Sequence, residues 1–308
     1  MVRGSVDHYI ILDGTLSSLE PGYETNAGRL FKLLSENGFS ATRTLYYEPG
    51  VQWEDWMHLA DVAQGRGAFA VRSLAGAIDQ VGLLQRDFAT ERNVQLAYRH
   101  YQRDPARASA KAFARRFCHK APVIEMVGVW DTVKALGLRM PFLWTLTDPK
   151  HAFHNDQLGP SVRHGFQALA LNETRVVFQP ILWRCPPDWR GNVEQVWFRG
   201  AHADIGGQLG RFIASRPLSN IPLVWMLERL EGCGTDLPEG WRDRYPCDQK
   251  APMVGTWRGF GWVFLQRARR KIGQDRSESI HPSALTDRNA WARETLKLAA
   301  EKRVSPPE

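Results

Sequence analysis

Asp13, Asp131 and His202 are the residues of this sequence whose types and positions could do chemistry together. Each comes soon after a short apolar run that is typical of a buried β-strand. In an open α/β sheet, ligands bind outside the carboxyl ends of the strands, so one sheet would bring the three side chains to the same rim. An imidazole that takes a proton and a carboxylate that orients it are the base and the acid of nucleophilic catalysis.

The residues beside these three positions have a structural reading as well as a functional one. Gly14 and Thr15 follow the first aspartate and complete either part of a site or only a turn. Gly206 and Gly207 let the backbone turn sharply or approach another segment closely. Asp204 is expected to organise its loop. In the structural reading, the second aspartate caps the next segment and the histidine is only hydrogen-bonded.

The strand–helix–strand beginning of the chain predicts a doubly wound, mostly parallel α/β sheet. The expected strands are residues 8–12, 41–47, 123–129 and 194–198, and the expected helices are residues 26–37, 68–80, 90–102, 104–118, 161–171, 221–230 and 287–302. Residues 51–64 are expected to be a helical turn or an ordered loop, and 134–160 a loop. One domain is predicted over 1–308, with a sheet core at 6–210 and a helical and irregular C-terminal part at 211–303.

Three of the expected helices have polar residues where a cap would stand. Asn26, Thr90 and Asp104 are predicted to cap the helix starts, because their side-chain oxygens can accept from the first free backbone N–H groups. Pro105 suits the first position of the third of these helices.

Composition narrows the classes of function. The 308 residues carry a formal net charge of +7, but the charges are mixed in sign, and the short basic run at 267–271 is read in a helical context. We therefore expect no nucleic-acid partner. The four cysteines lack metal-ligand spacing, so no metal and no cofactor are expected. No signal peptide or membrane span is predicted, which favours a cytoplasmic protein and leaves signal-independent secretion and peripheral membrane contact open.

The order of the acid and the base along the chain predicts where a nucleophile should stand. Asp131 followed by His202 matches the α/β-hydrolase order of nucleophile, acid and histidine. The nucleophile would then stand earlier, in a Gly-x-Ser-x-Gly turn between a strand and a helix. The stretch at 62–76 has the turn glycines and the helix, but Gly65 stands at the position of the serine.

Several motifs together resemble one family. They are Asp13-Gly14-Thr15 after a strand, GVWDTV at 128–133, GAHADIGG at 200–207, RGAFAVRSLAG at 66–76, ALALNE at 168–173 and IHPS at 280–283. They are similar to the α/β-hydrolase family long described as a bacterial domain of unknown function, which includes the catalytic domain of a type VI secretion phospholipase effector. The resemblance covers residues 8–290.

The resemblance implies roles for individual residues. Asp131 and His202 would be the acid and the base of a Ser-Asp-His triad, and Gly65 would occupy the place of the nucleophile. Gly14, Thr15 and Arg66 would line an oxyanion hole or pocket, supported by residues at 13, 204, 206 and 207. Compared with the family, roughly 30 residues, about one helix and one central strand, are missing before the elbow.

Three interpretations follow from this resemblance. The chain is a serine ester hydrolase of the phospholipase or lipase kind that is impaired by Gly65. Alternatively, it is a non-catalytic hydrolase-like domain that binds a lipid or small ester, or a defective copy with an internal deletion. A phosphatase of the haloacid dehalogenase type is disfavoured, because Ile11 stands where that motif needs a nucleophilic aspartate. The oligomeric state is left open.

Overall fold

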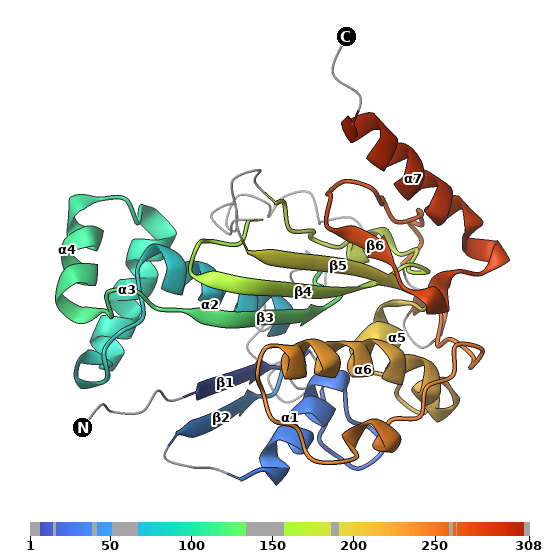
Figure 1. Ribbon diagram of the computed structural model, residues 1–308, viewed down its shortest axis with the longest axis horizontal. Coiled ribbons are helices and arrows are strands. Elements are labelled where there is room, and N and C mark those ends of the chain that lie inside the picture. The colour runs from blue at the N-terminus through green and yellow to red at the C-terminus, as the bar shows by residue number, and fades with distance from the viewer. Residues whose placement is uncertain are drawn as a thin grey trace.

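The computed structural model describes residues 7–14, 17–38, 42–50, 67–133, 157–185, 191–258, 261–262 and 264–304. Its strands are β1 (Asp7–Leu12), β2 (Arg43–Glu48), β3 (Ile124–Trp130), β4 (Val162–Ala170), β5 (Asn192–Phe198) and β6 (Glu278–Ile280). Every pairing between these strands is parallel, in the orders β1-β2 and β3-β4-β5-β6. The prediction of a mostly parallel α/β fold is therefore confirmed (Figure 1).

Helices cover both faces of the four-stranded sheet (Figure 1). The α-helices are α1 (Asn26–Glu36), α2 (Gly67–Gln80), α3 (Glu91–Arg103), α4 (Ala108–Phe117), α5 (His202–Gly206), α6 (Arg216–Gly232) and α7 (Ala290–Val304). Phe166, Phe198 and Trp225 belong to a core between the sheet and α6. Ala75 of α2 packs with Val127 and other residues of the opposite face. Burial of these two apolar faces gives the fold its layered core.

The expected helix at 161–171 is wrong, because these residues form the central strand β4. β4 is paired on both sides, with β3 and with β5. The segment carries alanines and few β-branched residues, which favoured a helix on propensity. Tertiary packing decides otherwise: a Cβ on Gly165 would come within 2.3 Å of Leu158, so the strand is built for close contact with its neighbours.

Two of the three predicted helix caps differ from the structure. Thr25, and not Asn26, caps α1 by accepting from the backbone N–H of Gly28. The Asn26 amide instead donates to the carbonyl of Ile205, which ties α1 to α5. Asp104 forms a turn, so α4 begins at Ala108 and not at residue 105. Thr90 does cap α3 as expected.

The C-terminal part contributes more order to the sheet than was expected. The strand β6 lies in the part predicted to be helical and irregular, and it pairs with β5. α6 begins at Arg216, five residues before its predicted start, and continues through Pro222. β6 is only three residues long, which is too short to give a strand signal in the sequence. Pairing with β5 supplies most of the stability of this strand.

Among the residues that the structure describes, the strands form two sheets, β1-β2 and β3-β4-β5-β6. β1 and β3 are each paired on one side only in the part of the chain that the structure describes. A doubly wound sheet would place the nucleophile strand between them. The expectation for residues 51–64, and most of the loop expected at 134–160, lie outside the described residues.

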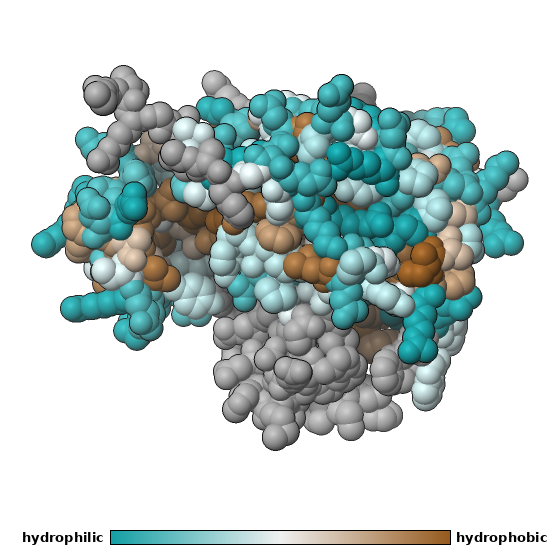
Figure 2. Space-filling view, turned by 90° about the horizontal axis from the view of Figure 1, so that it is seen from below, coloured by the Kyte–Doolittle hydropathy of each residue, from teal (hydrophilic) through white to brown (hydrophobic). Residues whose placement is uncertain are grey.

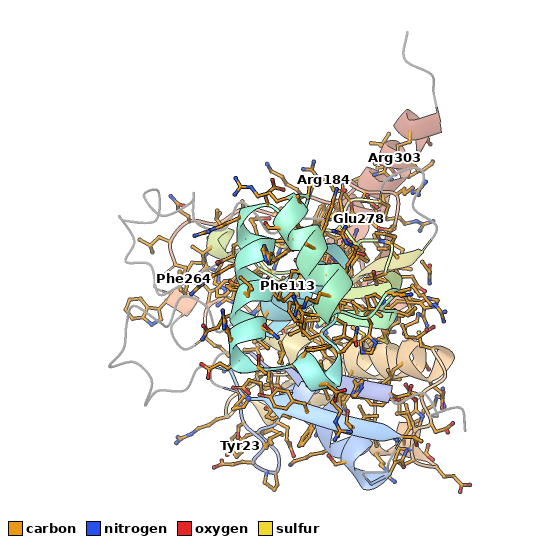
Figure 3. The ribbon with its side chains drawn as sticks, turned by 90° about the vertical axis from the view of Figure 1, so that its left-hand side faces the viewer. Tyr23, Phe113, Arg184, Phe264, Glu278 and Arg303 are labelled. Carbon is orange, nitrogen blue, oxygen red and sulfur yellow. The ribbon has the colours of Figure 1, made fainter. Side chains whose placement is uncertain are left out.

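The helices α3 and α4 form a projection at one end of the molecule (Figure 1). Phe113 of α4 packs with Tyr101 of α3 and with Val81 in a small core of their own (Figure 3). Apolar surface is exposed in a hollow between this projection and the rest of the molecule (Figure 2). Among the described residues, no helix combines the length and the apolar character that crossing a bilayer requires.

The contact between α5 and α1 predicts a contrast between two neighbouring glycines. Gly207 has φ +82°, and a Cβ there would lie 2.5 Å from the backbone nitrogen of Asn26, whereas a Cβ on Gly206 would meet nothing within 4 Å. We expect Gly207→Ala to lower the free energy of unfolding by roughly 2 kcal/mol or more, and Gly206→Ala to change it by less than about 0.5 kcal/mol. Denaturant unfolding of both variants measures the difference, and equal effects would contradict the packing described.

Candidate acid and base site

Asp131 stands at the end of β3 in a strained backbone conformation. Its φ of +42° lies in the left-handed region, which costs a non-glycine residue about 1–2 kcal/mol. Its backbone N–H donates to Ala168, and its Oδ1 accepts from the N–H of Ala170 at 2.9 Å. The end of β4 therefore holds the turn and fixes the carboxylate, which is fully buried.

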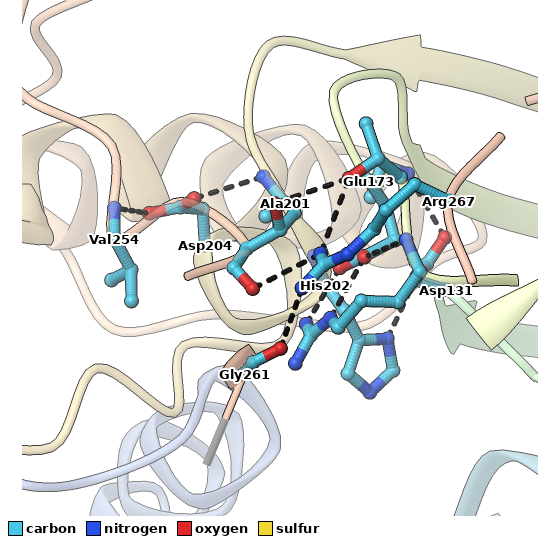
Figure 4. A network of polar contacts seen from close by, with 12 residues as sticks. Asp131, Glu173, Ala201, His202, Asp204, Val254, Gly261 and Arg267 are labelled. Atoms are coloured by element: carbon cyan, nitrogen blue, oxygen red, sulfur yellow. Dashed lines mark hydrogen bonds and ion pairs between the residues drawn. The ribbon is translucent and has the colours of Figure 1, made fainter. Parts of the chain in front are cut away.

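His202 begins α5 and meets this carboxylate. Its Nδ1 lies 2.7 Å from Oδ2 of Asp131, and its side chain is 30% exposed. Phe178 stacks on the imidazole ring at 5.0 Å between centroids. With Nδ1 bound to the carboxylate, Nε2 is the ring nitrogen left for a ligand or a proton. The structure thus brings together two of the residues that the sequence placed on one rim (Figure 4).

Arg270 is a third member that sequence reasoning missed. Its side chain is fully buried, and its Nη2 donates to the same Oδ2 at 2.9 Å. Burial by itself would raise the pKa of Asp131, but the charge of Arg270 and the hydrogen bond from His202 outweigh it and lower that pKa. The carboxylate is therefore held ionised. Nε and Nη1 of Arg270 have no hydrogen-bond partner among the described atoms.

Glu173 ties the start of α5 to the segment after β4. Its buried carboxylate accepts from the side chain and the backbone N–H of Arg175, and from the backbone N–H of His202 at 3.1 Å. Burial would raise the pKa of Glu173, but the charge and hydrogen bonds of Arg175 lower it. This anion lies at the positive end of a short helix, where a negative charge is favoured.

Asp204 organises the loops around the site, as the sequence suggested. Its buried carboxylate accepts from the backbone N–H of Ala201 at 2.9 Å and of Val254 at 2.8 Å, and from the hydroxyl of Ser215 (Figure 4). The aspartate has all its oxygens occupied by structural donors. It holds the α5 turn against two later segments and is not directed at a ligand.

Asp13 belongs to a separate cluster that joins β1, β2 and α1. Its Oδ2 accepts from the hydroxyls of Thr25 and Tyr47, and its Oδ1 accepts from the backbone N–H of Gly14 at 2.6 Å. The N–H of Gly14, one of the three residues expected to line an oxyanion hole or pocket, is therefore occupied in this structure. Thr15, Gly65 and Arg66 lie outside the described residues.

Arg270 and Glu173 could have been found only in part from the sequence. Glu173 belongs to a segment that resembles the family, and this was its only signal. Arg270 was hidden in the basic run at 267–271, which was read as a helix and is not one. A buried arginine next to an exposed one has no distinct sequence pattern, since only the fold decides which is inside. The described residues contain no group of three His, Cys, Asp or Glu side chains that could hold a metal.

Comparison with known proteins identifies a family. A family model described as T6SS, phospholipase effector Tle1-like, catalytic domain matches residues 64–229, which is more than half of the chain. One similar solved structure, an uncharacterized protein from Pseudomonas aeruginosa, is 15% identical with a TM-score of 0.47 over 99% of this chain and 60% of that chain. Another is the Tle1 effector bound to the VgrG spike of the type 6 secretion system, at 18% identity and a TM-score of 0.31 over 67% and 51%. The chain thus spans less than two thirds of either. No curated protein sequence matches it.

The buried pair of Arg270 and Asp131 predicts a non-additive effect on stability. Arg270→Met leaves a buried carboxylate without its cation, and we expect it to lower the free energy of unfolding by about 3–5 kcal/mol. In Asp131→Asn/Arg270→Met both charges are gone, and asparagine tolerates the left-handed backbone, so much of the loss should be recovered. Denaturant unfolding measures the cycle. Arg269→Met, a change at the exposed neighbour, is the control, and an equally large loss there would contradict the assignment.

Glu173 and Asp13 predict opposite contributions to the pH dependence of stability. The folded pKa of Glu173 lies below its ordinary 4.5, so its contribution is complete above pH 4.5 and is lost as the pH falls through the folded pKa. Burial raises the pKa of Asp13 above 3.8 despite its hydrogen bonds. Its contribution is complete below pH 3.8 and is lost as the pH rises through the folded pKa. Unfolding measured from about pH 3 to about pH 6 should therefore show a weaker acid loss in Glu173→Gln and a steeper one in Asp13→Asn. The same slope in both would contradict these assignments.

Proposed function

We propose, from the premise that this chain belongs to the family of Tle1-like catalytic domains of type VI secretion phospholipase effectors, that its site binds esters of the phospholipid class. In this proposal, Asp131 and His202 act as the acid and the base of an ester hydrolase. It also includes impaired hydrolysis, because the position matched to the nucleophile is Gly65.

The pairing of His202 with buried Asp131 is the observation that carries this proposal. The 2.7 Å contact between Nδ1 and Oδ2 is the arrangement in which a carboxylate fixes the imidazole tautomer. Nε2 would then take the proton of an attacking hydroxyl, and the ionised carboxylate would stabilise the imidazolium that forms. Arg270 keeps Asp131 ionised, and Glu173 holds the backbone of the histidine.

The impairment rests on the missing nucleophile. Glycine has no side chain to attack an ester, and loss of the nucleophile from such a triad costs on the order of a millionfold in rate. Ser73 lies within α2, about two helical turns beyond the matched position, so it does not replace the missing serine. An ester bound beside His202 would therefore turn over slowly at most.

A non-catalytic ligand-binding role is the second candidate, and one contact favours it. The backbone N–H of Gly14 donates to Asp13 at 2.6 Å, so this donor does not point at a developing oxyanion. A domain that kept the pocket and lost both the nucleophile and this donor would bind an ester without turnover. A defective copy, the third interpretation, would instead fail to unfold cooperatively.

Active-site labelling tests the proposal. We expect a fluorophosphonate probe, mapped by mass spectrometry, to leave the wild-type chain unlabelled. In Gly65→Ser it should label the introduced hydroxyl, and Gly65→Ser/His202→Ala should lose that labelling because the base is gone. A wild-type adduct that His202→Ala removes would overturn the missing-nucleophile assignment. No labelling of a folded Gly65→Ser would overturn the match of residue 65 to the elbow.

Equilibrium dialysis with a soluble short-chain phosphatidylcholine then separates the two candidates. Retained ester with slow His202-dependent release of fatty acid supports the impaired hydrolase, and retained ester without release supports the binding role. No retention would contradict both. The cytoplasmic location stays a prediction, and membership in a family of type VI secretion effectors favours export.

A further inference from the structure

Two segments next to His202 expose large apolar side chains. Trp257, Trp262 and Leu265 are 62%, 63% and 79% exposed, and Ile213 is 44% exposed. Exposed tryptophans and aliphatic side chains that gather on one surface mark an interaction site more often than scattered ones do. Phe264 of the same segment lies at the margin of the molecule in Figure 3.

Ring contacts connect these segments to each other and to the site. Phe264 meets Phe178 edge to face at 5.6 Å, and Phe178 stacks on His202. The guanidinium of Arg258 lies over the ring of Phe212 at 3.8 Å, which joins the segment before α6 to the segment after residue 256. These contacts place the segment around Phe264 beside His202 and join residue 258 to the segment of Phe212.

The two segments that carry these side chains have basic residues and no acidic ones. Residues 205–227 and 249–274 contain no aspartate or glutamate, and they include Arg211 and Arg258, both exposed. Arg267 stacks over Trp257 at 3.9 Å and donates to the carbonyl of Gly261, and its Nε is buried without a partner among the described atoms (Figure 4). Two acids of the site, Asp131 and Glu173, are buried and paired with Arg270 and Arg175.

We propose that Trp257, Trp262, Leu265 and Ile213, with Arg211 and Arg258, form a docking surface for an anionic lipid bilayer, beside His202. Tryptophan and leucine side chains insert at the boundary of headgroups and acyl chains, and arginines at the same level bind lipid phosphates. A basic, aromatic surface whose two segments carry no acidic residue complements such a membrane and does not complement a neutral one. The inference deepens the proposed function, on which it rests for the nature of the ligand at His202.

Vesicle flotation of the full chain tests the docking surface. We expect binding to vesicles of phosphatidylcholine with about one third phosphatidylglycerol, and much weaker binding to phosphatidylcholine alone or at high salt, where charges are screened. Trp262→Ala/Leu265→Ala should weaken binding by about tenfold or more. Arg211→Gln/Arg258→Gln should weaken it by about fivefold for each charge removed.

Matched controls separate this surface from a general property of the chain. Val94→Ala/Leu298→Ala removes two other exposed apolar side chains, and Arg92→Gln/Arg115→Gln removes two exposed charges of the α3–α4 projection. Both should bind as the wild type does. No wild-type binding, or equal losses in controls and surface variants, would overturn the inference.

The test also distinguishes failure of the inference from failure of the proposed function. His202→Ala should float with anionic vesicles as the wild type does, because docking does not use the imidazole. Flotation of a chain that retains no soluble ester would leave the docking surface standing and contradict the proposed function. Retention of soluble ester without flotation would contradict the docking surface alone.

Discussion

The arrangement around His202 depends on the burial of one negative charge. The Asp131 carboxylate is removed from water at the end of β3, and an ion in that position is unstable unless it is paired and hydrogen-bonded. The backbone of Ala170, the guanidinium of Arg270 and the ring of His202 meet this need. These groups come from β4, from the segment before β6 and from α5, so one charge fixes the relative positions of three distant parts of the chain.

This constraint explains why the acid and base half of the site is well formed although the described strands form two separate sheets. All of its members come from β3, from the ends of β4 and β5, and from the C-terminal segment, on one side of the division. The nucleophile half would come from the other side, between β2 and α2, where residues 51–66 lie outside the described structure. The cluster of Asp13, Thr25 and Tyr47 stabilises the first pair of strands independently.

The arginines of the site and those of the surface beside it have different surroundings. Arg270 is paired with Asp131 and Arg175 with Glu173, whereas Arg211 and Arg258 are exposed in segments without acidic residues. Phe264 packs against Phe178, and Phe178 stacks on His202, so aromatic side chains extend up to the imidazole ring.

The sequence by itself determined the α/β class, the strands β1, β2, β3 and β5, and the placement of Asp131 and His202 on one rim. These follow from local apolar runs and from the rule that parallel strands end together. Only the tertiary structure decided that residues 162–170 are a strand, because pairing on both sides overrode their weak local preference. It also decided that Arg270 is inside while its basic neighbours are outside, since a buried charge is recognised only by the partner it meets in the fold.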